Sequence, residues 1–227
     1  MDGKERAGVW AAEQVTDGMT VGLGTGSTAA YFVRALAQRI RDEGLKIQMA
    51  SSSFSTVLLA EELGLPLLPL EQVRKLDLYA DGADEVDPLK RLIKGRGAAM
   101  VREKILAHAA TRFLVLIEPV KCVERLGVRF PVPVEVLPFA YHLGRQELLT
   151  LGATSVSLRM ATEKDGPIIT DQGNFVIDAR FPKSVDVASL DSPINNIPGV
   201  VGHGLFAQYA GRTTVAIGHA TGVEVVP

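Results

Sequence analysis

The sequence contains one cysteine in 227 residues, Cys122, so no intramolecular disulfide can form. A chain without disulfides suits a reducing compartment, and we expect a cytoplasmic protein. No apolar run of about 18 residues is present, and no basic segment is followed by an apolar one. We therefore expect neither a membrane span nor a secretory signal peptide, and no membrane partner.

The charges show no large excess of either sign, with 24 Lys and Arg against 26 Asp and Glu and a net charge of -2 at pH 7. This balance argues against a nucleic-acid partner, which selects surfaces rich in Lys and Arg. An anionic substrate is therefore expected to be small. With 47% hydrophobic and 22% charged residues, the chain has the composition of a globular protein that buries a large core, in one domain or in two small ones.

Motifs of metal and covalent catalysis are missing as well. The four histidines, His108, His142, His203 and His219, are scattered without an HxxxH or HxH pair. The segment DGADEVD lacks the alternating ligands of an EF-hand loop, so no metal site is expected. No GxSxG elbow supports covalent hydrolysis, and no GK[ST] lysine supports a nucleoside triphosphatase. Proton transfer is the chemistry that remains.

A glycine-rich turn lies between a predicted strand and a predicted helix near the N-terminus. Residues 19–24 (MTVGLG) favour a short apolar strand, and the apolar residues of 29–40 repeat as one face of a helix. Between them, glycines let the backbone approach an anion, and helix-start amides and the hydroxyls of Thr25, Ser27 and Thr28 point toward it. This turn predicts a phosphate site. The alternative is that Ser27 or Thr28 only caps the helix and that the glycines only turn the chain.

The same turn matches the dinucleotide fingerprint GxGxxG only loosely. No acidic residue follows where a ribose ligand of NAD is expected, because residues 45–50 lead instead into Ser51–Ser53. A strand end rich in hydroxyls suits a sugar phosphate better than NAD. We therefore expect a small sugar phosphate as the ligand.

Reactive groups are concentrated in residues 81–104. Residues 76–80 (LDLYA) predict a buried strand that brings Asp81 and Asp84 to its carboxyl end, where ligands collect in open α/β sheets. The glycine-rich segment 94–97 then leads into a helix over 98–110, which carries Glu103. Taken singly, the glycine segments are common turns, and a helical glutamate is usually exposed. Their clustering favours a functional site.

The face on which Glu103 lies follows from the helical period of 100° per residue. Val101, Ile105 and Ala109 repeat at four-residue spacing as an apolar stripe, and Glu103 points away from it. Its sector is not an ordinary solvated face, because it is shared with apolar residues: Ala99, Leu106, Ala107 and Ala110.

Helices and strands alternate up to residue 130, which predicts a doubly wound, mostly parallel Rossmann-like sheet. The composition changes at 130–133 (FPVP), after which the predicted order β-α-β-β-α-β indicates a smaller ferredoxin-like α+β domain. In this second domain, residues 167–181 are expected to form two strand segments around 171–174. We predict one α/β domain from residues 1–130 plus 207–227 and a second domain from residues 131–206.

An ordered set of motifs resembles the type A ribose-5-phosphate isomerases over nearly the whole chain. The set is GLGTGSTAAYF, SSSFST, YADGADEVD, KGRGAAMVREKI, FPVPVEV, TDQGN and NNIPGVVGHGLF. The resemblance implies interconversion of ribose 5-phosphate and ribulose 5-phosphate through an enediolate, in the non-oxidative pentose phosphate pathway. It also implies that neither a metal nor an organic cofactor takes part, and that the protein is a homodimer or homotetramer.

Residue roles follow from the same resemblance. Glu103 is similar to the catalytic base, and Asp81, Asp84 and Lys94 are similar to the groups around the sugar oxygens. The implied substrate-binding set comprises Lys4, Thr25, Gly26, Ser27, Thr28, Gly82, Gly95, Arg96, Gly97 and Lys121. The chemistry agrees, because a weakly acidic C–H proton needs a carboxylate beside it and stabilisation of the developing oxyanion. The division of ring opening between Asp81 and Asp84 stays open.

Two positions depart from the family pattern: Arg96 stands where glycine is usual, and Phe54 stands where a smaller polar residue is expected. The competing interpretations are a sugar-phosphate sensor without turnover and a dehydrogenase. The sensor is disfavoured because little chain precedes the first predicted helix and because Glu103 would have no use there.

Overall fold

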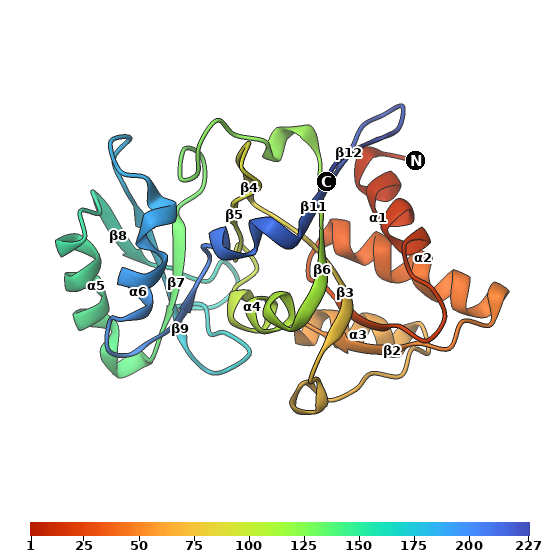
Figure 1. Ribbon diagram of the computed structural model, residues 1–227. Coiled ribbons are helices and arrows are strands. Elements are labelled where there is room, and N and C mark those ends of the chain that lie inside the picture. The colour runs from red at the N-terminus through yellow and green to blue at the C-terminus, as the bar shows by residue number, and fades with distance from the viewer. The chain divides into compact units, whose positions relative to one another are not determined.

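The computed structural model describes residues 1–227, and the chain forms two compact units (Figure 1). Unit 1 contains Met1–Ala83, Arg102–Lys121 and Tyr209–Pro227, and unit 2 contains Asp84–Val101 and Cys122–Gln208. The units and the predicted domains are different divisions, since 84–101 and 122–130 lie in unit 2. The predicted domain boundaries stay a prediction.

Unit 1 is built on a six-stranded sheet with the order β12-β11-β6-β3-β1-β2. Its strands are β1 (Thr20–Leu23), β2 (Gln48–Ser51), β3 (Leu76–Gly82), β6 (Ala110–Ile117), β11 (Thr213–Gly218) and β12 (Val223–Val226). All neighbours pair in parallel except β12, which is antiparallel to β11 at the edge. The doubly wound, mostly parallel sheet is confirmed, and the C-terminal residues return to it.

Helices flank this sheet. They are α1 (Gly3–Glu13), α2 (Ser27–Glu43), α3 (Phe54–Glu62) and α4 (Met100–Ala109), with 3₁₀ turns η1 (Leu70–Gln72), η2 (Pro119–Lys121) and η5 (Ala207–Arg212). The helices α1 and α2 pack on each other, α1 against β6 and β11, and α2 against β3 and β6. Phe32, Val33 and Leu36 of α2 are fully buried there, which confirms the predicted helical face. No helix of the structure has the length and apolarity to cross a membrane.

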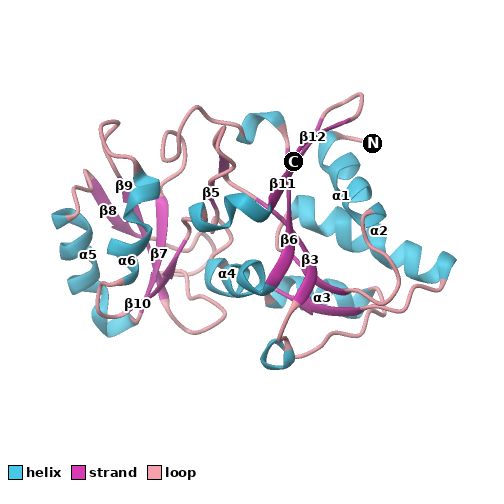
Figure 2. Cartoon of the chain, in the orientation of Figure 1, coloured by secondary structure: helices cyan, strands magenta, loops and turns pink.

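Unit 2 contains an antiparallel sheet with the order β10-β7-β9-β8 (Figure 2). Its elements are β7 (Val132–Val136), η3 (Pro138–Ala140), α5 (Tyr141–Thr150), β8 (Ser155–Leu158), β9 (Phe175–Arg180), η4 (Val187–Leu190), α6 (Asp191–Asn195) and β10 (Val200–His203). The β-α-β-β-α-β order and the antiparallel pairing confirm the ferredoxin-like unit. A small hairpin of β4 (Glu85–Val86) and β5 (Leu92–Ile93) was not predicted.

One local prediction is wrong. Residues 167–170 form no strand, because only isolated bridges join Pro167 to Met160 and Ile169 to Phe175. The prediction that Glu103 lies on a sector of α4 that is not solvated is confirmed: Glu103 is 4% exposed, and Leu106 and Ala107 are fully buried, whereas Ile105 of the apolar stripe is 47% exposed. The small alanines let the helix pack closely, so the sector that contains Glu103 faces the protein interior.

Candidate functional site

Polar residues of unit 1 lie at the switch point of the sheet, where the order of successive strands reverses. Strand β1 pairs with β2 on one side and with β3 on the other, so the loops after β1 and β3 diverge at their carboxyl ends. Open α/β sheets bind ligands in the crevice at such a switch point. The loop after β1 is Gly24–Gly26, which leads into Ser27 and Thr28 at the start of α2, and the end of β3 carries Asp81.

Asp81 joins these two loops. Its carboxylate is fully buried, and Oδ1 accepts hydrogen bonds from Thr25 N at 2.9 Å and Gly82 N at 2.7 Å. Oδ2 accepts a short hydrogen bond from the Tyr79 hydroxyl. A Cβ on Gly24 would lie 2.4 Å from Asp81 Cγ, so only glycine admits this carboxylate. The structure therefore gives Gly24 a role in seating Asp81.

Hydroxyl groups from the residues after β2 and from the start of α3 surround the same turn. Thr25 Oγ1 lies 2.7 Å from both Ser52 Oγ and Ser53 Oγ, and Thr56 Oγ1 donates to Gly24 O at 2.7 Å. Ser52 and Ser53 are buried, so their hydroxyls are used within the protein. The hydroxyl-rich strand end thus fixes the shape of the glycine turn.

Helix α2 begins at this turn without a side-chain cap. Its N-cap is Gly26, with φ +99°, and no side chain bonds the first amides. The alternative in which Ser27 or Thr28 only caps the helix is therefore wrong. Ser27 is exposed and Thr28 is half-buried. Uncapped amides at a helix start attract an anion, since they combine free donors with the positive end of the helix dipole.

Glu103 and Asp81 act electrostatically on one buried hydroxyl. Burial raises the pKa of the Tyr79 phenol well above its usual value, and the charges of Asp81 and Glu103 raise it further. Glu103 itself is only 4% exposed on α4. Tyr79 therefore stays protonated and donates to Asp81, with the second carboxylate in electrostatic range. Sequence reasoning missed Tyr79, although its position two residues before Asp81 puts both side chains on one face of β3.

Two predicted lysines each contact Glu118, the residue that follows β6. Lys4 Nζ lies 3.7 Å from Glu118 Oε2, and Lys121 N donates to Glu118 O at 2.9 Å. Both side chains are half-buried. Sequence reasoning did not single out Glu118, which contacts both of these residues.

In unit 2, Asp84, Lys94, Gly95 and Arg96 form one connected turn. Asp84 Oδ2 accepts from Arg96 N at 2.9 Å, and Asp84 N donates to Ile93 O at 2.8 Å. Lys94 is 3% exposed, and its Nζ lies 5.7 Å from the ring centroid of Phe206. Gly95 has φ +106°, a conformation that disfavours any other residue, and a Cβ there would lie 2.8 Å from Pro133 Cγ. Both the backbone conformation and the lack of space therefore exclude a side chain.

The two departures from the family pattern are accommodated locally. Arg96 is exposed and contributes its backbone N–H to the turn, so the larger side chain projects away. Phe54 is 54% exposed, and the Arg102 guanidinium lies 4.5 Å from its ring centroid.

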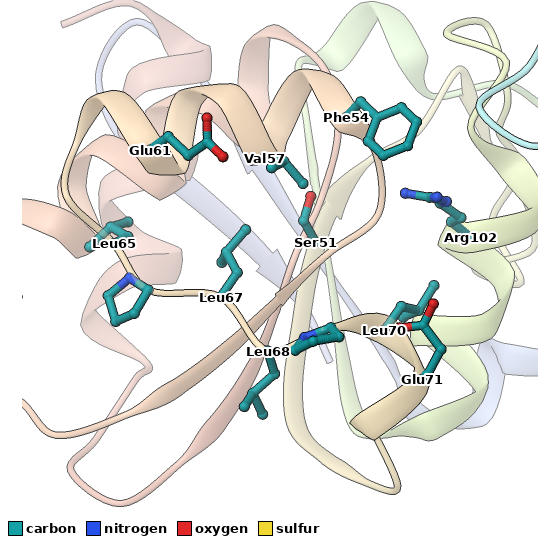
Figure 3. A pocket seen from close by; sticks show the side chains of 12 residues that line it. Ser51, Phe54, Val57, Glu61, Leu65, Leu67, Leu68, Leu70, Glu71 and Arg102 are labelled. Atoms are coloured by element: carbon teal, nitrogen blue, oxygen red, sulfur yellow. The ribbon is translucent and has the colours of Figure 1, made fainter.

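Phe54 and Arg102 line a pocket of about 480 Å³ in unit 1. Figure 3 shows the pair facing each other at one end of the pocket, with Leu65 and Leu67 toward the other end. None of the predicted site residues lines this pocket, and Ser51 alone connects it to the hydroxyl cluster. The pocket is therefore distinct from the predicted site.

Carboxylates, lysines and hydroxyls make up the candidate site. No group of three or more His, Cys, Asp or Glu side chains is placed to hold a metal ion. Unit 1 offers a buried carboxylate on a helix, which is linked through Tyr79 and Asp81 to a turn suited to an anion. These are the groups needed to move a proton on a phosphorylated substrate.

The fold and these groups define an α/β protein with its polar residues at the switch point of a doubly wound sheet. The family model for "Ribose 5-phosphate isomerase A (phosphoriboisomerase A)" matches residues 48–222. A ribose-5-phosphate isomerase A from Thermosynechococcus vestitus is 52% identical over 201 residues, covering 88% of this chain and 85% of the relative.

Solved structures of ribose-5-phosphate isomerases are also similar to this chain. The ribose 5-phosphate isomerase A of Methanocaldococcus jannaschii is 41% identical with a TM-score of 0.92, covering 98% of this chain and 97% of that one. A D-ribose-5-phosphate isomerase solved with phospho-erythronic acid has the same identity and TM-score, covering 98% of this chain and 96% of the other. The chain belongs to the ribose 5-phosphate isomerase A family.

Proposed function

We propose that this protein interconverts ribose 5-phosphate and ribulose 5-phosphate, as an aldose–ketose isomerase of the pentose phosphate pathway. The observation that carries the mechanism is the buried Glu103, whose charge acts together with that of Asp81 on the Tyr79 hydroxyl. Isomerisation moves a proton between C1 and C2 through an enediolate, and a positioned carboxylate is the simplest group that does this.

Glu103 is proposed as that base. Its place on a helix whose interior-facing neighbours are Leu106 and Ala107 holds the carboxylate out of bulk water. A base typically contributes ~10²–10⁴ in rate, so stabilisation of the enediolate oxygens must supply much of the rest. Lys94 is proposed for that task, since it is a buried cation on the rigid turn 94–97.

The phosphate is proposed to bind at Gly24–Thr28, with Lys4 and Lys121 assisting. The support is the uncapped start of α2 and the absence of acidic residues from its first turn. Phosphate binding energy would then position the reacting carbons as well as hold the substrate.

Asp81 and Asp84 are proposed for different tasks. Asp81 is fully buried and accepts three hydrogen bonds, which suits holding the Thr25 turn and Tyr79 in place. Asp84 is half-buried with its Oδ2 on the Arg96 amide, which suits contact with the sugar hydroxyls and assistance in ring opening.

The deciding experiment is an assay for ribulose 5-phosphate formation from ribose 5-phosphate, run with and without EDTA. We expect turnover that EDTA does not reduce, because the proposed chemistry uses side chains alone. Binding of ribose 5-phosphate without turnover would instead support the sugar-phosphate sensor. Activity that is lost on chelation and restored by a divalent ion would overturn the metal-independent mechanism.

We also propose that the protein is a homodimer or homotetramer, as the family resemblance implies, and that it works in the cytoplasm. The single cysteine, Cys122, is exposed and free, which suits a reducing compartment.

A further inference from the structure

Arg159 lies just after β8 and connects the sheet of unit 2 to the turn 94–97. Its guanidinium forms a bidentate ion pair with Asp178 on β9. Nε donates to Oδ2 at 2.8 Å, and Nη2 donates to Oδ1 at 2.5 Å. The third nitrogen, Nη1, donates to the backbone oxygens of Gly95 at 2.7 Å and Arg96 at 3.0 Å. One side chain therefore bonds two successive carbonyls of the turn.

The anchor of this contact is rigid. Arg159 N donates to Val176 O at 2.8 Å, and Arg159 O accepts from Ile168 N at 2.9 Å, so its backbone is bonded on both sides. The side chains of Arg159 and Asp178 are 12% and 20% exposed, which protects the ion pair from solvent screening. A bidentate pair between a planar guanidinium and a carboxylate fixes the orientation of the guanidinium as well as its distance.

The carbonyls that Arg159 holds determine where the amides of the turn point. Because a trans peptide is planar, its N–H lies opposite its C=O. With the oxygens of Gly95 and Arg96 both on Arg159, the N–H groups of Arg96 and Gly97 point to the other side of the turn. The Arg96 N–H is used by Asp84 Oδ2, whereas the Gly97 N–H makes no hydrogen bond within the protein.

We propose that Arg159, held by Asp178, is a positioning residue that aims the Gly97 N–H beside Asp84 at an oxygen of the sugar phosphate. This inference rests on the proposed function, which supplies the substrate, and adds two residues that none of the motifs points to. Successive backbone amides in a turn form a concave anion-binding site, and such donors act on developing charge only when they are preoriented. Without the guanidinium, the 96–97 peptide loses the contact of its oxygen and is free to rotate, so the orientation of the Gly97 N–H is lost. The 95–96 peptide keeps its bonds from Ala98 N to Gly95 O at 3.0 Å and from Arg96 N to Asp84 Oδ2 at 2.9 Å.

The test compares four variants. Arg159→Met removes the contact but leaves the half-buried charge of Asp178 without its partner. The pair variant Arg159→Met/Asp178→Asn removes that charge as well. Arg159→Lys keeps the charge but cannot bond the carboxylate and both carbonyls together. Arg180→Met is the matched control, because Arg180 is an exposed arginine at the end of β9 whose contact is with Arg129 O at 3.4 Å.

We expect the pair variant to lose ~10²-fold in kcat, the typical cost of a small misplacement at the reacting groups, and Arg159→Lys to lose less. Inhibition by phospho-erythronic acid, whose carboxylate resembles the enediolate, should weaken in parallel. Inhibition by inorganic phosphate should stay unchanged, since its proposed site is the Gly24–Thr28 turn of unit 1. Arg180→Met should behave as wild type in all three measurements.

A purely structural role predicts a different pattern: phosphate and phospho-erythronic acid inhibition weaken equally while the melting temperature falls. That pattern, or a normal kcat in the pair variant, overturns the inference. The amide signal of Gly97 gives a readout independent of turnover, because phospho-erythronic acid should shift it in the wild type and not in the pair variant. If the wild type shows this shift but does not convert ribose 5-phosphate, the proposed function fails and the role of Arg159 stands.

Discussion

At the scale of single residues, the site rests on one phenol between two carboxylates. Tyr79 is fully buried, its ring stacks on Phe113 with centroids 5.0 Å apart, and its hydroxyl donates to Asp81. A buried acceptor is costly to leave unsatisfied, so this donor keeps Asp81 in a fixed position. Glu103 is the carboxylate that we propose for proton transfer, which makes it the residue whose replacement is most informative.

Replacing Glu103 by Gln keeps the size of the side chain and removes its basicity. If Glu103 moves the proton, kcat should fall by ~10²–10⁴ while affinity for phospho-erythronic acid changes little. Exchange of deuterium at C2 with solvent should stop as well. Glu62→Gln on the exposed face of α3 is the control and should leave both unchanged. Near-normal turnover and exchange in Glu103→Gln would make Asp81 or Asp84 the leading candidate.

Tyr79→Phe tests the phenol through stability at high pH. Burial and the charges of Asp81 and Glu103 raise the pKa of Tyr79 above its usual value of about 10. The folded protein therefore keeps this proton where the unfolded chain has released it, and the free energy of unfolding falls as the pH rises through about 10. Tyr79→Phe should lose ~1–3 kcal/mol at neutral pH.

Urea unfolding of both proteins between neutral and alkaline pH measures this difference. The gap between wild type and Tyr79→Phe should narrow above pH ~10, because only the wild type has this proton to lose. A gap of constant size across that range would contradict the raised pKa of Tyr79.

At the scale of elements, the sequence predicts long periodic segments well and short or register-dependent features poorly. The helical face of α2 and the order β7-α5-β8-β9-α6-β10 follow from periodicity and turn residues. Strands β4 and β5 have two residues each, too few to show a period. The buried sector of α4 that contains Glu103 was predicted from the helical period, because apolar residues share that sector.

The site was predictable where the chemistry lies on adjacent residues, and not where it depends on strand pairing. Asp81, Asp84 and Lys94 lie within one segment, and Thr25 belongs to a recognisable turn. The contacts of Arg159 with Gly95 and Asp178 depend on how β8 pairs with β9 and where that sheet meets the turn. No local pattern contains that information.

The glycine turn after β1 gives an element-scale prediction. A Cβ at residue 24 would lie 2.4 Å from Asp81 Cγ and 2.5 Å from Ala80 O, so Gly24→Ala must displace the end of β3. We expect a loss of ~1–3 kcal/mol in unfolding free energy, together with reduced activity. Gly211→Ala has open space around its Cβ and is the matched control. Equal stability of the two variants would show that the close approach of Gly24 and Asp81 is not needed.

Lys121 tests the second part of the proposed phosphate site. Lys121→Ala should raise KM for ribose 5-phosphate and weaken inhibition by inorganic phosphate, because it removes one positive charge near the carboxyl end of β6. Lys75→Ala, an exposed lysine before β3, serves as the control for net charge. An unchanged KM in Lys121→Ala would remove this residue from the site.

At the scale of the whole molecule, each unit contains its own sheet and its own hydrophobic core. The core of unit 2 is formed by residues of β7, β9, α5 and α6, such as Val134 and Ile177. Its outer face nevertheless exposes apolar side chains: Phe139 is 88% exposed, and Leu143, four residues later, is 45% exposed. The spacing puts these two side chains on one side of the η3–α5 segment.

This exposed pair gives a specific form to the proposed assembly. Sedimentation at micromolar concentration should give a mass that is a multiple of 24.3 kDa. If Phe139 and Leu143 contact a second copy, Phe139→Ser should shift the mass toward 24.3 kDa, because aromatic side chains contribute much of the binding energy of such interfaces. Phe54→Ser, which alters an exposed phenylalanine of unit 1, is the control and should leave the mass unchanged. A wild-type monomer would refute the assembly, whereas an oligomer that survives Phe139→Ser would place its interface on another surface.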